Sequence, residues 1–297
     1  MYCKKAGARI DFLQYLETDI SLYIMSLLHD PADLVRASSV SHFWQQFVIE
    51  NGFAKELCLK TLLGCSNFLG TVNESKGKNN SLETDHQVYA ALLYAFTFTA
   101  NKYPSRNIAE TRNIPNILPI GKLSNWFSTG QRNAHVPETF IYILRRRLYV
   151  FTEIKVKHLP AIGSPEVFSA KSVRFRIGHA KSPRDNALYP ITDEKVEWTY
   201  TSPEFPVKQE HKVQLFKLPQ PVLCLGGYLK IEFLGRVQRH QKMDCSIYGI
   251  LSYLQALGHR LFPAFEAKIH ERYGKSLLMY NPDKLGRSLG RVFKALY

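Results

Sequence analysis

The residues of this chain that could do chemistry are ten histidines, five cysteines and scattered carboxylates, and their spacing matches no catalytic motif. The sequence contains no GxSxG, HExxH, GxGxxG or CxxC pattern. The closest mixed group, His240, Asp244 and Cys245, has none of the spacings of a zinc site. Gly274-Lys275-Ser276 resembles the end of a phosphate-binding loop, but the glycine needed five residues earlier is Ile269. We therefore expect no enzyme, no metal site and no cofactor.

The cysteines and the apolar runs bear on where the protein works. Five scattered cysteines indicate neither a disulfide framework nor a paired zinc motif. The N-terminus has no apolar run of signal-peptide length, and no later stretch approaches the 18 or more apolar residues of a membrane span. We expect a reducing compartment, the cytoplasm and/or the nucleus, and no membrane span.

The net charge of +14 is unevenly placed along the chain. Residues 1–60 hold six Lys/Arg and seven Asp/Glu, so the basic surplus belongs to the later part. Basic residues there are spread out, apart from Arg145-Arg146-Arg147, and an alternating run such as Val173-Arg174-Phe175-Arg176 is what a half-buried strand requires. Solvated surface charge explains the pattern best, so we do not expect nucleic acid as a partner.

Three short helices are predicted near the N-terminus, and they must position whatever function this region has. Ile20, Ile24, Leu27 and Leu28 form one helical stripe. Asp30-Pro31 breaks that helix and starts a second, with Asp30 as N-cap and Pro31 at the first helical position. Ser41 caps a third helix, and the same spacing repeats from Val40 through Trp44, Phe47 and Val48 before Asn51-Gly52 ends it.

The later chain changes character. Residues 64–85 are polar and predict a linker, followed by one or two helical turns over 89–96. Strand-length runs rich in Val, Ile, Phe, Tyr and Thr then occupy 139–157, 171–178, 195–200, 212–217, 227–235 and 246–257. Many short strands and few helices predict a β-sandwich or a barrel.

The C-terminal residues predict an amphipathic helix. Its apolar face would carry Leu285, Leu289, Val292, Phe293 and Leu296, and basic residues occupy the other faces. Such a helix could bind an anionic membrane surface or a partner groove, but docking on the protein's own sandwich is the simpler interpretation.

The N-terminal stretch resembles an F-box over about forty positions, from Asp11 onward. The resemblance is most specific in residues 30–59, which read DPADLVRASSVSHFWQQFVIENGFAKELCL and are similar to a group of plant F-box proteins. One departure is Glu17, where the family has proline after Leu16. Loss of proline there leaves the unfolded chain freer, so we expect weaker but not abolished adaptor docking.

The second part resembles the discoidin-like (galactose-binding-like) jelly-roll domain of the same plant group. The resemblance rests on Gly227-Tyr228-Leu229-Lys230-Ile231-Glu232-Phe233-Leu234-Gly235-Arg236 and on Gly258-His259-Arg260. The expected fold class is a multidomain α plus β chain, in which a small three-helix F-box precedes an antiparallel β-sandwich (jelly-roll, discoidin-like). The expected divisions are a tail at 1–10, the F-box at 11–60, a linker at 61–87, the sandwich at 88–262 and an extension with the amphipathic helix at 263–297.

The resemblance implies a non-catalytic substrate receptor. The F-box would bind a Skp-family adaptor and thereby a cullin–RING ubiquitin ligase, while the sandwich would hold an unidentified protein substrate, so that catalysis comes from proximity. The candidate adaptor face consists of Leu16, Ile20, Ile24, Leu27, Leu28, Leu34 and Val40. Some of these must also close the small helical core, and Trp44 and Phe47 are expected in that core.

An alternative function retains a binding role for the sandwich but involves no ubiquitin ligase. The basic sandwich and the missing proline are also compatible with a carbohydrate- or anion-binding module whose F-box is vestigial. In that case a loop tryptophan such as Trp126 could stack on a sugar.

Overall fold

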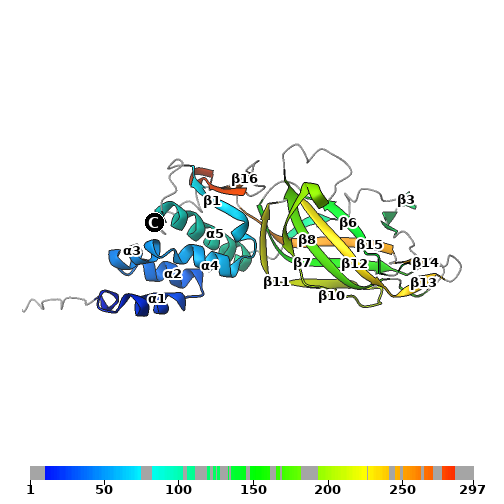
Figure 1. Cartoon of the computed structure of the whole chain (residues 1–297), viewed down its shortest axis with the longest axis horizontal. Coiled ribbons are helices and arrows are strands. Elements are labelled where there is room, and N and C mark those ends of the chain that lie inside the picture. Colours follow the sequence, from blue (N-terminus) through cyan, green and yellow to red (C-terminus); the bar gives the residue numbers. More distant parts are fainter. Residues whose placement is uncertain are drawn as a thin grey trace, which may run out of the picture.

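A computed structural model covers the chain and places helices at one end of an elongated molecule and a β-sandwich at the other (Figure 1). The structure describes residues 11–74, 82–102, 106–110, 119–120, 123–124, 126–127, 133, 135–144, 148–160, 165–167, 169–181, 193–225, 227–240, 245–247, 250–261, 264–269 and 276–284.

The first three helices form as their caps predict. They are preceded by a short 3-10 turn η1 (Phe12–Gln14) and comprise α1 (Thr18–Ser26), α2 (Pro31–Ser38) and α3 (His42–Glu50). The Asp30 carboxylate accepts a hydrogen bond from the Ala32 amide at 2.8 Å, and the Ser41 hydroxyl accepts one from the Trp44 amide at 3.2 Å. Both predicted N-caps are therefore confirmed.

A fourth helix, α4 (Phe53–Thr61), follows at once and exceeds the three that the sequence predicts. Gly52 adopts a left-handed φ of 66°, so it ends α3 and turns the chain into α4 within one residue. The Asn51-Gly52 signal was correct as an end of α3, but it is also the start of the next helix.

The stretch predicted as a linker is folded onto the helices. It includes the 3-10 turn η2 (Cys65–Asn67), the strand β1 (Phe68–Asn73) and the first turns of the long helix α5 (Leu82–Lys102). Val88, Tyr89 and Leu92 of α5 are buried in one cluster with residues of α1 to α4. This helix therefore belongs to the helical body, although the predicted boundary at residue 88 assigns most of it to the sandwich.

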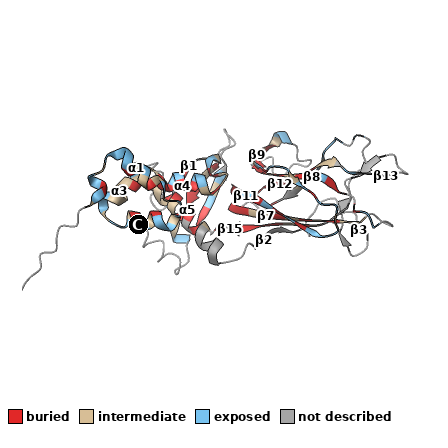
Figure 2. Ribbon diagram, turned by 90° about the horizontal axis from the view of Figure 1, so that it is seen from below, coloured by how far each residue is buried: buried red, intermediate tan, exposed pale blue. Residues whose placement is uncertain are grey.

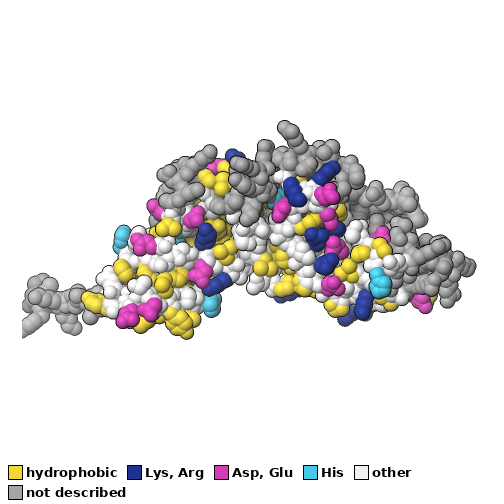
Figure 3. All heavy atoms as spheres, viewed as in Figure 1, with side chains coloured by type: hydrophobic (Ala, Val, Ile, Leu, Met, Phe, Trp, Pro, Cys, Tyr) yellow, Lys and Arg dark blue, Asp and Glu magenta, His cyan; other side chains and the backbone are white. Residues whose placement is uncertain are grey.

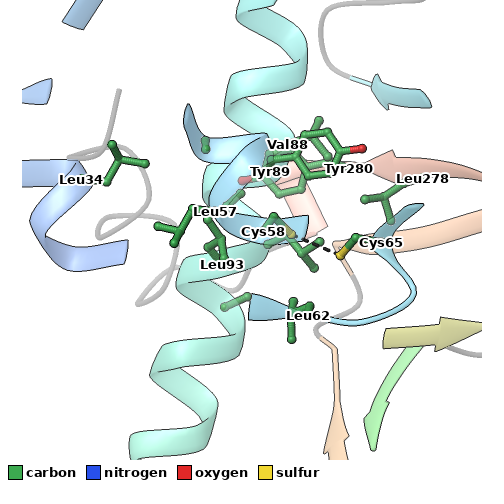
Figure 4. Packing of buried hydrophobic residues seen from close by; sticks show 14 of the residues in the cluster. Leu34, Leu57, Cys58, Leu62, Cys65, Val88, Tyr89, Leu93, Leu278 and Tyr280 are labelled. Atoms are coloured by element: carbon green, nitrogen blue, oxygen red, sulfur yellow. Dashed lines mark hydrogen bonds between the residues drawn. The ribbon is translucent and has the colours of Figure 1, made fainter. Parts of the chain in front are cut away.

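The end of the described chain returns to the same body. Two strands, β16 (Phe265–Ile269) and β17 (Ser276–Tyr280), join β1 in a three-stranded sheet of order β1-β17-β16. The β1–β17 pair is parallel, and the β16–β17 pair is antiparallel. Tyr280 and Leu278 lie in the helical core near Tyr89 (Figure 4). The predicted amphipathic helix over 285–297 lies outside the described residues.

Two antiparallel sheets of five strands build the sandwich. One sheet has the order β10-β8-β12-β6, with β9 on β8, and the other has the order β11-β7-β15-β2, with β5 on β15. The first contains β6 (Glu138–Ile143), β8 (Ala170–Ala180), β9 (Val196–Thr201), β10 (Phe205–Pro206) and β12 (Tyr228–Arg236). The second contains β2 (Arg106–Glu110), β5 (Trp126–Phe127), β7 (Leu148–Leu159), β11 (Val213–Leu225) and β15 (Ile250–Arg260).

Short pairs complete the described strands: β3 (Pro119–Ile120) with β4 (Leu123–Ser124), and β13 (Gln238–His240) with β14 (Cys245–Ile247). The chain crosses repeatedly between the two large sheets, as in a jelly-roll, and their facing side chains make one apolar core that includes Phe151, Phe175 and Ile231. The predicted antiparallel jelly-roll sandwich is confirmed.

A continuous core joins the helical body to the sandwich. Buried residues run along α4, α5 and β7 (Figure 2). Leu148 and Val150 of β7 and Leu223 of β11 belong to the helical cluster rather than to the sandwich core. At the same junction Leu63 bridges to β11, donating its amide to the Pro221 carbonyl at 2.9 Å and accepting from the Leu223 amide at 2.7 Å.

Candidate functional site

The helical body presents an apolar surface to solvent. Within α1, Ile20, Tyr23 and Leu27 are exposed, and their spacing places them on one face of the helix. The apolar surface is defined here by all exposed large apolar side chains from η1 to α3: Phe12, Tyr15, Ile20, Tyr23, Leu27, Val40 and Phe43. Hydrophobic side chains gather over this end of the molecule in Figure 3. Clusters of exposed apolar residues of this kind are typical of protein–protein interfaces.

The candidate adaptor residues divide into three groups by exposure. Ile20, Leu27 and Val40 are exposed, and Leu16, Ile24 and Leu28 are half-buried. Leu28 also packs against the helical core. Leu34 is only 5% exposed and lies within that core, so its place in the candidate face has to be corrected. It faces inward because α2 packs against α5 and α4.

Four aromatic residues of the apolar surface were missed by sequence reasoning: Phe12, Tyr15, Tyr23 and Phe43. The predicted adaptor face contains aliphatic residues only, and Trp44 and Phe47 are the aromatic residues predicted for the core. Tyr23 stands three residues after Ile20 and four before Leu27, so the same helical spacing would have found it.

A polar contact fixes η1 against the start of α3. The Asp11 carboxylate accepts hydrogen bonds from the Ser41 hydroxyl at 2.6 Å and from the Trp44 indole nitrogen at 2.7 Å. The Phe12 and Trp44 rings meet edge to face with centroids 5.3 Å apart. Trp44 and Phe47 pack against the helical core, as predicted. Asp11 and Phe12 therefore hold the start of η1 beside α3.

The backbone at Glu17 has the conformation that proline would impose. Glu17 is the N-cap of α1, with φ −61° and ψ 146°, and its carbonyl accepts the Ser21 amide at 3.0 Å. A φ near −65° is the value that the proline ring fixes. The start of α1 thus keeps its geometry without the family's proline.

The cysteines near the helical body are structural. The Cys58 and Cys65 sulfurs lie 3.3 Å apart in the buried core between α4, α5 and the three-stranded sheet (Figure 4). Burial raises the pKa of the Cys58 thiol, and the neighbouring Cys65 adds to that effect. The Cys58 thiolate is therefore disfavoured, and Cys58 offers no ready nucleophile.

The charged cluster on the outer face of the β8–β12 pair is internally neutralised. It consists of the cations Arg174, Arg176 and Lys230 and the carboxylates Asp193, Glu204 and Glu232. The Lys230 ammonium lies 2.9 Å from both carboxylate oxygens of Asp193, and the Arg174 Nε lies 2.7 Å from Glu232. Each cation has a carboxylate partner, so the cluster is a structural network and does not favour an anion site.

Other residues that could bind a ligand lie in regular strands of the sandwich. Trp126 lies in β5, paired with β15, and not in a loop. Burial in the sandwich lowers the pKa of His158 to about 4, so it is neutral near pH 7. Gly274, Lys275 and Asp244 lie outside the described residues. Among the residues that the structure describes, no group of three metal-binding side chains comes together and no helix could span a membrane.

Comparisons with known proteins agree with the helical part. Residues 18–60 match the family model described as F-box-like. An F-box protein of Arabidopsis thaliana is 36% identical over an alignment of 323 positions, which covers 93% of this chain and 84% of the relative.

A structural neighbour is less informative. A family 32 carbohydrate-binding module of C. perfringens NanJ, solved in complex with galactose, overlaps 50% of this chain and 91% of its own length at 10% identity. Its TM-score of 0.29 is too low to support a conclusion about this chain. The family model and the long match to the plant relative suffice: the chain belongs to the F-box protein family.

Proposed function

We propose that the apolar surface docks a Skp-family adaptor and that the sandwich binds a target protein for ubiquitination by a cullin–RING ligase. F-box proteins in general are non-catalytic subunits that recognise the substrates of SCF ubiquitin ligases. We also propose that this chain works in the cytoplasm and/or the nucleus, as its receptor role requires. Ligase chemistry would reside in other subunits, and this chain would contribute proximity.

The observation that carries the proposal is the exposure of Ile20, Tyr23 and Leu27 along one face of α1. An isolated helical body gains nothing from leaving three large apolar side chains in water. Full burial of an exposed apolar side chain contributes about 1.5–3 kcal/mol, and these side chains are about half-exposed, so burying the rest of each would contribute roughly 1 kcal/mol. Such a row matches the helix-in-groove mode, in which anchors at helical spacing fill apolar pockets.

The decisive experiment compares two leucine-sized positions of similar exposure. Ile20 on α1 is 44% exposed, and Leu59 on α4 is 40% exposed and lies outside the apolar surface. Ile20→Asp should weaken binding to a purified Skp-family adaptor by at least ~30-fold, because it loses apolar burial and desolvates a carboxylate. The Leu59→Asp variant should bind the adaptor with the same affinity as the unmodified chain. Melting temperatures close to that of the unmodified chain would show that both variants fold.

Two results would contradict the docking assignment. If Ile20→Asp bound the adaptor normally, the α1 face would not be the interface. If both aspartate variants lost binding equally while folded, the effect would come from charge on the helical body and not from a specific face.

A further inference from the structure

The outer edge of β11 is open over its first half. β11 is the terminal strand of its sheet, with β7 on one side. Its second half is covered, because Leu63 bridges to Val222 and exchanges backbone hydrogen bonds with Pro221 and Leu223. Over 213–217, the described part of the chain supplies no backbone partner on the side away from β7. Every second amide and carbonyl there points away from the sheet.

The same five residues carry exposed apolar side chains. Gln214 and Phe216 face the sandwich interior and are buried. Val213 and Leu215 face outward and are 50% and 53% exposed. Natural sheets rarely leave branched apolar residues on an open edge, because such an edge invites another strand.

Positive charge surrounds these apolar side chains. On β7, Lys157 is the register partner of Val213, and Lys155 is the partner of Leu215. Lys217 stands opposite Glu153. Lys208 and Lys212 precede the strand, with Glu210 between them. This region therefore contains five lysines and only two glutamates among the residues named here.

We propose that this β11 edge (Lys212–Lys217) binds an extended acidic segment of the target protein by strand addition. The added strand would complete the backbone hydrogen bonds of the edge, and its apolar side chains would cover Val213 and Leu215. Its acidic side chains would lie beside Lys217 and within reach of the β7 lysines across one strand.

The charge also decides between possible occupants. A second copy of this chain pairing through the same edge would bring lysine against lysine, which is destabilising for residues directly opposite in a sheet. An acidic segment replaces that repulsion with attraction. The inference rests on the proposed function only in naming the occupant as the ligase target.

The probe, called the Glu-Val peptide, is fluorescein-labelled Glu-Ser-Val-Ser-Val-Ser-Glu, whose Val and Glu side chains all lie on one face of an extended strand. Its binding to the full chain is measured by fluorescence anisotropy. It should bind more tightly than a Lys-Val peptide of equal length, and the affinity should fall with added salt, because surface charges are screened. A Glu-Val peptide with alternate N-methylated amides should lose binding at least tenfold, since it cannot complete the edge. Equal binding of the three peptides would overturn the proposal, as would no binding of the Glu-Val peptide.

A matched pair of variants locates the site. Val213 and Val237 have nearly equal exposure, 50% and 51%, but Val237 follows β12 and lies outside the edge. Val213→Asp should lower the affinity for the Glu-Val peptide at least tenfold, and Val237→Asp should leave that affinity unchanged. Equal effects of the two variants would place binding elsewhere and overturn the proposal.

Adaptor binding separates this proposal from the receptor assignment. The Val213→Asp variant should still bind the adaptor, whereas the Ile20→Asp variant should still bind the Glu-Val peptide. A chain that binds the peptide at β11 without any adaptor would leave the edge site standing and remove the ligase role. A chain that binds the adaptor but not the peptide would remove the edge site alone.

Discussion

Replacing Asp11 by alanine tests whether one partly buried carboxylate organises the apolar surface. Asp11 accepts from the Ser41 hydroxyl at 2.6 Å and from the Trp44 indole at 2.7 Å, so its loss removes both bonds between η1 and the start of α3. The Ser41 hydroxyl keeps its capping bond to the Trp44 amide but loses its own acceptor. Phe12 then keeps its edge-to-face contact with Trp44, and η1 keeps the buried side chain of Leu13.

The expected loss of stability in Asp11→Ala follows from the two hydrogen bonds that the carboxylate accepts. A bond to a charged group contributes about 1.5–3 kcal/mol, and partial exposure of Asp11 argues for the lower end of that range. We therefore expect Asp11→Ala to lower the free energy of unfolding by about 2–3 kcal/mol. In a double-mutant cycle with Trp44→Phe, about half of that loss should appear as coupling between the two residues.

Urea unfolding, followed by circular dichroism in the helical region, measures this effect. Asp19→Ala is the control, because within the described part of the chain the Asp19 carboxylate accepts only the neighbouring Ile20 amide on the surface of α1. Its cost should stay below about 1 kcal/mol. A cost below about 0.5 kcal/mol for Asp11→Ala, or zero coupling to Trp44, would refute the claim that this contact holds η1 in place.

Two further predictions concern stability. Gly64 and Gly52 both have positive φ, but a Cβ at Gly64 would lie 2.2 Å from the Leu223 carbonyl oxygen, whereas one at Gly52 would meet nothing within 4 Å. Thermal unfolding should show a loss of about 1–2 kcal/mol for Gly52→Ala and clearly more for Gly64→Ala, and equal losses would contradict the close approach. For His158, burial lowers the folded-state pKa to about 4 against an ordinary value of 6.5. Above pH 6.5 neither state binds the proton, and between pH 6.5 and 4 only the unfolded chain does, so the folded state loses stability as pH falls through this window. His158→Phe should flatten that pH dependence in urea titrations, and an unchanged slope would show that other groups cause it.

Local signals account for what could be predicted from the sequence. Asp30-Pro31 and Ser41 act through bonds to residues two or three positions away, so the helix starts were readable. Strand alternation was equally readable, since Val173, Phe175 and Ile177 all face the sandwich core. The resemblance of residues 30–59 supplied the family.

Long-range packing accounts for what could not be predicted. The polar composition of 64–85 hid β1, because that strand is completed by β17 about 200 residues later. The F-box resemblance placed Leu34 on the adaptor face, but the position of α5 decides that it is buried. The open half of β11 is likewise invisible in sequence, since it depends on where Leu63 comes to lie.

The return of the chain to the helical body has a mechanical consequence. The sandwich is an insertion, because α5 leads into it and β16 and β17 lead back to the strand β1 beside the helices. Two covalent crossings and the Leu63 bridge hold it, and Leu148 and Leu223 belong to the helical core. These connections restrict rotation of the sandwich relative to the helical body, whereas a domain on a single flexible linker can reorient freely. If the sandwich binds the target as proposed, the target would be held in a restricted range of orientations relative to the helical body. Ubiquitin would then reach only the lysines on one side of the target.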